Sequence, residues 1–385
     1  MIGGRYNKKG CKTLLKMMDY EIRHAEMSDL PAVRQMIDHS RSVMRRNGNH
    51  AQWVGYPTDD DLKADLQQEV SYLILQKGRP AGTFALVPGV EPTYGVIDHG
   101  RWIDPLQPYA TVHRLAAMPG THGIADAAFS FAANHYPYLR ADTHADNTIV
   151  RHLLENHRFV YSGIVYMDDG SPRRAYEWWR YDEVRPALRD YVFDQILPRY
   201  DRFDAAHRRD HALRVVARSM VLGRNYAVDP ELLFAAAAMH DVGLAEGREH
   251  HHLASGALIR EDAALPQWFD AEQIEIIACA AEDHRASATA APRSLYGCIV
   301  AEADRDVEPE TIVRRTVEYG LSHYPELDRE GHWQRTLDHL HEKYAEGGYI
   351  KLWLSDSPNA APLAELRALI KDTARLRLLF DQFYK

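Results

Sequence analysis

The spacing of apolar residues changes once along this chain, near residue 181, and this change divides the sequence into two parts. From residue 20 to about residue 180, strand-like apolar runs alternate with helical segments. Beyond this point nearly all apolar residues recur at the 3.6-residue spacing of helices. At 385 residues the chain is also too long for one ordinary core. We therefore predict an α+β domain over residues 20–180, a linker over residues 181–190 and an all-α domain over residues 191–385.

Short-range signals predict the elements of both parts. In the first part, the order is strand, helix, two-stranded meander, strand, helix, strand, helix and closing hairpin. We expect the meander to turn at Lys77–Pro80 and the hairpin at Asp168–Gly170. In the second part, Asp229–Glu231 and Asp270–Gln273 are patterns typical of helix starts. The fold class is therefore a mixed sheet with flanking helices, followed by a helical bundle.

Composition and charge limit the kinds of protein that fit. The formal charge of −9 argues against a surface that coats nucleic acid or binds an anionic membrane. Cys11, Cys279 and Cys298 lie far apart and predict neither a disulfide framework nor a thiolate metal site. No apolar run reaches the roughly 20 residues that span a bilayer. We expect a cytoplasmic protein without a membrane or nucleic-acid partner, and a homo-oligomer is compatible with the sequence.

The amino-terminal segment 1–19 is basic and amphipathic. It has neither a clean apolar core nor a small-residue cleavage site, so it does not resemble a signal peptide. We expect a disordered or frayed leader, with Met17 or Met18 as an alternative start.

The chain carries 21 histidines, many of them in the second part. An alanine-rich apolar helix over residues 231–244 carries the adjacent pair His240 and Asp241. A buried ionised carboxylate is costly unless it is paired or bound to a cation. His211, near the start of another helix, and Asp304, at the end of a third, would complete a site for Mn²⁺, Fe²⁺, Ni²⁺, Mg²⁺ or Zn²⁺. Residue chemistry alone leaves two interpretations open, a metal site or ordinary core and surface histidines.

The order of these four residues resembles the H…HD…D signature of the HD superfamily of metal-dependent phosphohydrolases. The segments FDAAHRRDHALRVVARS, AAMHDVGL, EDHRAS and RSLYGCIVAEADRD resemble one bacterial branch, and the similarity covers roughly residues 190–385. The resemblance implies a helical bundle that holds a divalent metal on His211, His240, Asp241 and Asp304. It also implies that a metal-bound water hydrolyses a phosphate ester, often in a nucleotide.

Further histidines and an arginine lie near this signature. His284 and Arg285 end a predicted helix, and we expect this pair to hold the substrate phosphate or to supply a general acid. His251 or His252 would bind a second metal or position phosphate, and His207 lies one helical turn before the first signature histidine. HD relatives with extra histidines after the HD pair can hold two metals. The other interpretation is that these histidines support the ligands or lie at the surface.

In the first part, a strand is followed by a turn with Gly120 and Gly123 and then by a helix. The backbone amides of such a turn, with the positive end of the helix, can hold a diphosphate. The two common nucleotide-binding fingerprints are both absent from the sequence. Phosphate binding and an ordinary turn are both compatible with this pattern.

The order of elements over about residues 20–180 resembles the GNAT family of N-acetyltransferases. Thr121–Ala125 stands where that family has its Q/R-x-x-G-x-G/A pyrophosphate loop, and the central glycine and the final alanine match. The resemblance implies acetyl-CoA as cofactor and an amine as acceptor. The residues implied to bind the cofactor are Leu115, Ala117, Thr121, His122, Gly123, Ile124, Ala125 and Asn147.

The match departs from the GNAT pattern near the expected catalytic positions. Arg158 replaces a glycine, and Leu154 stands near the place of a common general-acid tyrosine. His113 falls where many members carry a glutamate base, so it is the candidate base of this chain. Four polar residues at one strand end form either an acceptor pocket or a structural network: Arg140, Asp142, His144 and Asp146.

Together these patterns predict a bifunctional protein. The HD part would hydrolyse a nucleotide or another small phosphorylated metabolite, and the GNAT-like part would transfer acetyl groups from acetyl-CoA to an amine. In a first alternative, the GNAT-like part only senses acetyl-CoA and regulates the hydrolase. In a second, the protein binds nucleotide without cleaving it. The presence of all four signature residues argues against this second alternative.

Overall fold

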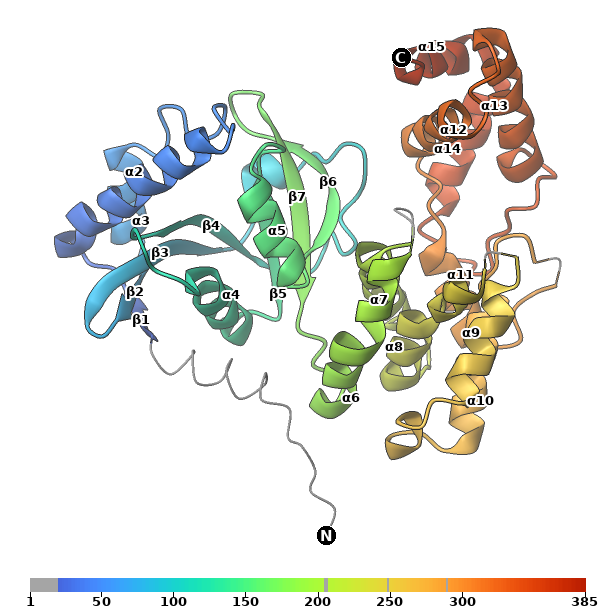
Figure 1. Cartoon of the computed structure of the whole chain (residues 1–385), viewed down its shortest axis with the longest axis horizontal. Helices are drawn as coiled ribbons and strands as arrows, with labels where there is room; N and C mark the ends of the chain where they lie inside the picture. The colour runs from blue at the N-terminus through green and yellow to red at the C-terminus, as the bar shows by residue number, and fades with distance from the viewer. Residues whose placement is uncertain (1–19, 204–206, 248, 289) are drawn as a thin grey trace. The chain divides into compact units, whose positions relative to one another are not determined.

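The computed structural model describes residues 20–203, 207–247, 249–288 and 290–385, so the predicted leader lies outside the described residues. The chain divides into two compact units between Tyr181 and Asp182 (Figure 1). Among the described residues, no helix has both the length and the apolar character to cross a membrane.

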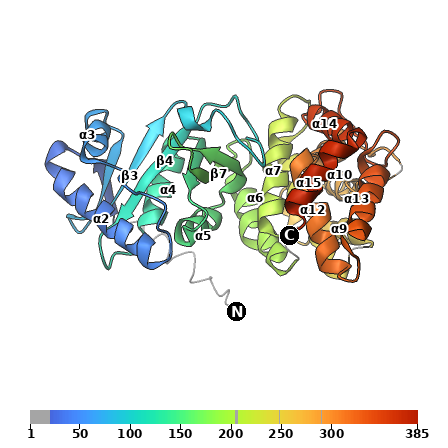
Figure 2. The ribbon, with the colours of Figure 1, turned by 90° about the horizontal axis from the view of Figure 1, so that it is seen from above.

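The first unit is built on a seven-stranded sheet in the order β1-β2-β3-β4-β5-β7-β6. Its strands are β1 Tyr20–His24, β2 Ser71–Gln76, β3 Arg79–Pro88, β4 Ala110–Ala117, β5 Tyr138–Thr143, β6 Val160–Tyr166 and β7 Pro172–Trp179. All neighbouring strands are antiparallel except β4 and β5. Its main helices are α2 Leu30–Arg46, α3 Asp59–Gln67, α4 Ile124–His135 and α5 Thr148–Asn156 (Figures 1 and 2). The predicted mixed sheet with flanking helices is confirmed, and both predicted turns join the expected strands.

The sheet packs helices on both faces because successive strand side chains point in opposite directions. Leu73 and Ile74 are neighbours in β2, and both are fully buried. Leu73 belongs to the core with α2 and α3, whereas Ile74 belongs to the core with α4. Helix α3 was not predicted, because its sequence DDDLKADLQ is mostly charged. A local signal was nevertheless present, since Thr58 and Asp61 form a capping box at its start.

Strands β4 and β5 are paired only at Ala110 with Leu139 and at Thr111 with Arg140. Strand β4 also contains a bulge, because it has one more residue than β3 between two paired positions. Arg114 lies in this bulge with a φ of 52°, which is unfavourable for a residue with a Cβ. Such conformations occur where the surrounding structure fixes them, often beside functional sites.

The second unit is helical, as predicted, and the segment expected as a linker overlaps its first helix, α6. Its helices are α6 Pro186–Tyr191, α7 Arg209–Gly223, α8 Pro230–Met239, α9 His251–Arg260, α10 Ala271–Asp283, α11 Leu295–Asp304, α12 Pro309–His323, α13 Arg329–Tyr344, α14 Ala360–Lys371 and α15 Thr373–Phe383. Both predicted helix starts are confirmed. The Asp229 carboxylate accepts from the backbone N–H groups at the start of α8, and Asp270 forms a capping box with Gln273. Helices α12 to α15 share a separate apolar core (Figure 1).

Candidate metal centre and acceptor cavity

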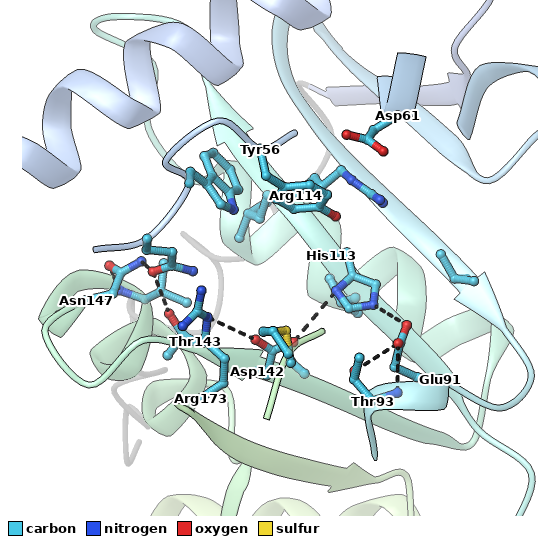
Figure 3. Close-up of a pocket in the computed structure, with 18 of the residues that line it drawn as sticks. Tyr56, Asp61, Glu91, Thr93, His113, Arg114, Asp142, Thr143, Asn147 and Arg173 are labelled. Carbon is cyan, nitrogen blue, oxygen red and sulfur yellow. Dashed lines mark hydrogen bonds and ion pairs between the residues drawn. The ribbon is translucent and has the colours of Figure 1, made fainter. Parts of the chain in front are cut away.

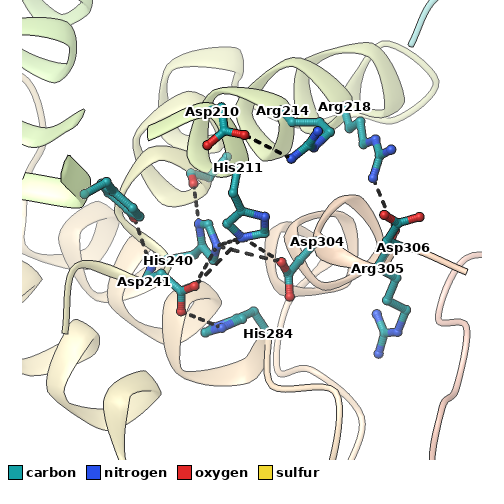
Figure 4. Close-up of polar contacts among 12 residues, drawn as sticks. Asp210, His211, Arg214, Arg218, His240, Asp241, His284, Asp304, Arg305 and Asp306 are labelled. Carbon is teal, nitrogen blue, oxygen red and sulfur yellow. Dashed lines mark hydrogen bonds and ion pairs between the residues drawn. The ribbon is translucent and has the colours of Figure 1, made fainter. Parts of the chain in front are cut away.

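Three separate helices of the second unit bring the four signature residues together (Figure 4). His211 lies in α7, His240 and Asp241 follow the last residue of α8, and Asp304 ends α11. Nε2 of His211 is 3.3 Å from Nε2 of His240 and 3.1 Å from Oδ1 of Asp304. The ligand atoms of these three residues all lie within 4.8 Å of one another. This spacing would let one divalent cation contact all three.

The end of α8 is fixed in a way that points two side chains at this centre. Every residue from Leu232 to Met239 is buried, so the helix carries His240 and Asp241 into the interior. Nδ1 of His240 is 2.8 Å from the carbonyl oxygen of Ala237, which leaves Nε2 to face the centre. The buried hydroxyl of Tyr200 donates to the carbonyl of Ala238 at 2.9 Å and accepts from the N–H of Asp241 at 3.2 Å.

The two oxygens of Asp241 face different histidines. Oδ2 is 3.4 Å from Nε2 of His240. Oδ1 is 3.2 Å from Nε2 of His284 and 3.3 Å from Nε2 of His251. Within the described residues this buried Oδ1 has no hydrogen bond of acceptable geometry. A buried carboxylate oxygen surrounded by imidazole nitrogens is the donor set that a divalent ion prefers, so the residues fit a metal.

The charges at the centre are strongly coupled. Burial raises the pKa of Asp241, but His240 and His284 outweigh burial and hold that pKa well below its ordinary range. At Asp304 burial is likewise outweighed, chiefly by His211, and the pKa is lowered. Burial lowers the pKa of His211, whereas Asp241 and Asp304 outweigh burial at His240 and raise its pKa to about 9. Both carboxylates are therefore ionised near neutral pH and available to a cation.

The other residues predicted around this centre lie in different positions. His284 is 3% exposed and its Nε2 faces Oδ1 of Asp241 at 3.2 Å, and its role as phosphate contact or general acid stays a prediction. Arg285 donates to the carbonyl oxygen of Glu249 at 2.9 Å. The ring of His252 lies 5.6 Å from that of His251, and burial and nearby cations lower the pKa of His252 to about 4. The ring of His207 is 5.7 Å from that of His211.

In the first unit, a cavity of about 610 Å³ lies where β4 and β5 diverge (Figure 3). Consecutive residues of a regular strand face opposite sides, yet both His113 and Arg114 line this cavity, because the bulge interrupts the alternation. Nε2 of His113 is 3.3 Å from Oε2 of Glu91, and Nδ1 is 3.8 Å from Oδ1 of Asp142. The cavity therefore presents an imidazole held between two carboxylates.

Acidic side chains outnumber basic ones around this cavity. The acidic lining residues are Asp61, Asp65, Glu91, Asp142, Asp168 and Asp169, and the arginines are Arg114 and Arg173. Arg114 pairs with Asp65 at 2.9 Å, which neutralises one of the two arginines. Hydrogen bonds from His113 and Thr93 outweigh burial and lower the pKa of Glu91 to about 2, so this carboxylate is ionised. The cavity is suited to a positively charged ligand.

The residues predicted to bind acetyl-CoA fall into two places. Leu115 and Asn147 line the cavity. Asn147 also caps α5, because it accepts from the N–H of Val150 at 3.3 Å. The segment Thr121–Ala125 forms the turn into α4, with Gly123 at a φ of 75° immediately before the helix. Ala117 ends β4, Ile124 is buried in the core, and Ala125 packs against that core.

Several residues of these sites were missed by reasoning from sequence. Tyr200 carried no signal, because it lies among charged residues in the segment QILPRYDRF, 40 residues before His240. Glu91 lies in a long connection between β3 and β4 and reaches His113 only through the fold. The order of strands predicted the strand that carries His113, but not the bulge that turns Arg114 into the same cavity.

Comparison with known proteins gives a family match in the second unit and matches to solved structures that cover about two fifths of the chain. A family model described as the HD domain matches residues 208–306. No curated protein matches the chain. A GNAT-family acetyltransferase structure from Streptococcus agalactiae 2603 is 27% identical, with 42% of this chain and 95% of that chain covered and a TM-score of 0.39. One from Listeria monocytogenes 4b F2365 is 16% identical, with 42% and 94% covered and a TM-score of 0.34. Over residues 208–306 the chain is thus similar to an HD domain.

Proposed function

We propose that the helical unit hydrolyses a phosphate ester of a nucleotide or another small phosphorylated metabolite at a divalent metal. The metal ligands would be His211, His240, Asp241 and Asp304. The observation that carries this proposal is the buried Oδ1 of Asp241, which faces two imidazole nitrogens without a hydrogen bond of acceptable geometry. The HD family match over the same residues supports it.

The residues around the centre have separable roles in such a reaction. A bound divalent ion supplies a water of lowered pKa and polarises the phosphoryl oxygen. The Tyr200 hydroxyl would hold Asp241 in the orientation that binds metal. His251 and His284, which face Oδ1 of Asp241, would supply ligands for a second ion. Arg214 lines a cavity beside the centre and would offset phosphate charge there.

The test is hydrolysis of a panel of nucleotides and phosphomonoesters by the purified full-length protein with Mn²⁺. We expect release of phosphate or pyrophosphate that is abolished by a chelator and by Asp304→Ala. Circular dichroism of the variant checks that the helical fold is retained. Activity that survives both the chelator and the substitution would refute the assignment.

A second observation supports acetyl transfer to an amine by the first unit. Its cavity lies between diverging strands and holds His113 between Glu91 and Asp142. We infer that His113 accepts the proton that the attacking amine loses, and that Glu91 stabilises the resulting imidazolium. The acetyl thioester would be supplied by acetyl-CoA, whose thiol leaves as the new amide bond forms. The acidic lining favours a positively charged acceptor.

Binding of acetyl-CoA, followed by a turnover assay over a broad panel of amines, tests this second activity. Acetylation that requires His113 would support catalysis. Binding without turnover on any amine would favour the alternative of an acetyl-CoA-sensing unit that regulates the hydrolase. Absence of binding would refute both interpretations.

A further inference from the structure

A second cavity of about 610 Å³ lies beside the candidate metal centre in the helical unit. His211 and Asp304 form part of its wall, so the cavity is continuous with the metal ligands. Other walls come from α7, α12 and α13. Helices α12 and α13 follow the residues matched by the HD family model, which end at residue 306. Any ligand contact on these helices therefore goes beyond what the family match assigns.

The described lining of this cavity is strongly cationic. Its arginine and lysine residues are Arg214, Arg218, Arg305, Arg315, Arg335 and Lys343. Its carboxylates are Asp304 and Asp306, and Asp304 is already a candidate metal ligand. The whole chain has a net charge of −9, so this excess of positive charge is a local feature and does not follow from composition. A confined cationic site beside a metal attracts polyanions.

The cations nearest α7 have partners within the protein. Arg214 lies 3.8 Å from the carboxylate of Asp210. Arg218 donates to the carbonyl oxygen of Arg305 at 3.3 Å. On α12, Arg315 is exposed and pairs with Asp306 at 3.0 Å. These side chains are held by the protein itself and form the rim of the cavity.

The two cations on α13 are different, because no ion pair with a described residue is formed by either. The ammonium of Lys343 lies 5.2 Å from the centroid of the Tyr344 ring. The guanidinium of Arg335 lies 4.9 Å from the centroid of the Tyr324 ring and donates to the carbonyl oxygen of Thr316 at 3.0 Å. Aromatic faces and one carbonyl stabilise these charges without neutralising them.

The environment between these two cations is positive enough to perturb a neighbouring histidine. Burial and the charges of Lys343 and Arg335 lower the pKa of His339, one turn from each on α13, to about 4. Burial also lowers the pKa of Lys343, and the charge of Asp304 opposes this effect. The charge of Asp304, a candidate metal ligand in the same cavity wall, therefore acts on Lys343. An anion bound here would relieve the repulsion among these groups.

We propose that this cavity binds a second phosphoryl group of the substrate, with Lys343 and Arg335 as its main contacts. The proposal rests on the proposed phosphohydrolase activity and specifies its substrate class. One phosphoryl group would lie at the metal ligands, and a second, in the same small molecule, would lie at α13. Charge-assisted hydrogen bonds from an ammonium and a planar guanidinium suit phosphoryl oxygens. The enzyme should then prefer compounds with two or more phosphoryl groups over monophosphates.

The first experiment compares nucleoside mono-, di- and triphosphates of one base as substrates of the full-length protein with Mn²⁺. For the wild type we expect a higher kcat/KM with the di- or triphosphate. Lys343→Met and Arg335→Met should each reduce the ratio of triphosphate to monophosphate kcat/KM at least tenfold. Lys371→Met removes an exposed lysine that pairs with Glu346 outside the cavity, and this control should keep the wild-type ratio. The use of two variants keeps the test decisive if one of them fails to fold.

The second experiment measures binding of inorganic triphosphate by calorimetry, so the cavity is tested even without turnover. We expect triphosphate to bind more tightly than phosphate, and Lys343→Met to weaken its binding at least tenfold. If no ester is hydrolysed but this binding pattern holds, the proposed activity fails while the anion subsite stands. A wild-type preference for monophosphates, or variants that bind triphosphate like Lys371→Met, would overturn the subsite. Single-stranded RNA that displaces triphosphate through these two residues would also overturn it, in favour of a nucleic-acid site.

Discussion

Asp241 and His284 lie far apart in the sequence, yet Oδ1 of the carboxylate is 3.2 Å from Nε2 of the imidazole. The other carboxylate oxygen, Oδ2, faces His240 at 3.4 Å. His240 thus belongs to both groups of potential ligands, His211 with Asp304 and Asp241 with His284. With imidazole nitrogens facing both of its oxygens, Asp241 would be suited to hold a divalent metal.

The first prediction concerns metal content. Elemental analysis of the purified protein should show about one or two first-row ions per chain. Asp241→Ala should remove the bound metal, because its two oxygens face the imidazoles of His240 and His284. His251→Ala should reduce the content to at most one ion, whereas His250→Ala, which changes an exposed side chain, should leave it unchanged. Full occupancy in Asp241→Ala would contradict the metal assignment.

The second prediction concerns Tyr200, whose hydroxyl bridges the carbonyl of Ala238 and the N–H of Asp241. Tyr200→Phe should weaken metal binding by about 10–100-fold, because the support of a ligand is lost. It should also lower the free energy of unfolding by about 1–3 kcal/mol, because buried polar groups lose their partner. Metal titration and urea denaturation measure the two effects. Tyr226→Phe, which removes a hydroxyl bonded to Asp356, should destabilise without changing metal affinity.

The third prediction concerns the acetyl-transfer cavity. His113→Gln should lower kcat for acetylation of an amine by about 10²–10⁴-fold, because the proton acceptor is lost. Binding of acetyl-CoA should remain, because His113 is expected to act in proton transfer. His152→Gln changes an exposed histidine outside the cavity and serves as the control. An unchanged rate in His113→Gln would show that another group removes the proton.

The fourth prediction concerns pH and stability. Burial and nearby cations lower the pKa of His339 to about 4, so the folded state favours the neutral imidazole. An unfolded histidine near its ordinary pKa of about 6.5 binds more protons, so stability must fall as pH drops from about 6.5 toward 4. The loss should be steepest between about pH 6.5 and pH 4, where the unfolded imidazole is protonated and the folded one is neutral. Urea denaturation of His339→Gln should show a correspondingly flatter profile over this range, and parallel profiles would contradict the assignment.

Local structure was predictable because its signals act over three or four residues. The capping box of Asp270 with Gln273 and the turn at Lys77–Pro80 were read from adjacent residues and are present in the structure. Helix α3 shows the limit of this reasoning. Its charged sequence lacks a clear apolar stripe, and only packing of Leu62 and Leu66 against the sheet explains its burial. Tertiary contacts there outweigh a weak local pattern.

By itself, the sequence determined the two-part division, the secondary structure of most segments and the four signature residues at helix ends, whose role as metal ligands stays a prediction. Only the tertiary structure decided that His284 faces Asp241 and that Lys343 and Arg335 line a cavity beside Asp304. The physical reason is the sequence distance over which each kind of interaction acts. Apolar periodicity shows which face of a helix is buried, but it does not show which other helix that face meets. That choice depends on packing among residues distant in the chain, and it sets the distances on which catalysis depends.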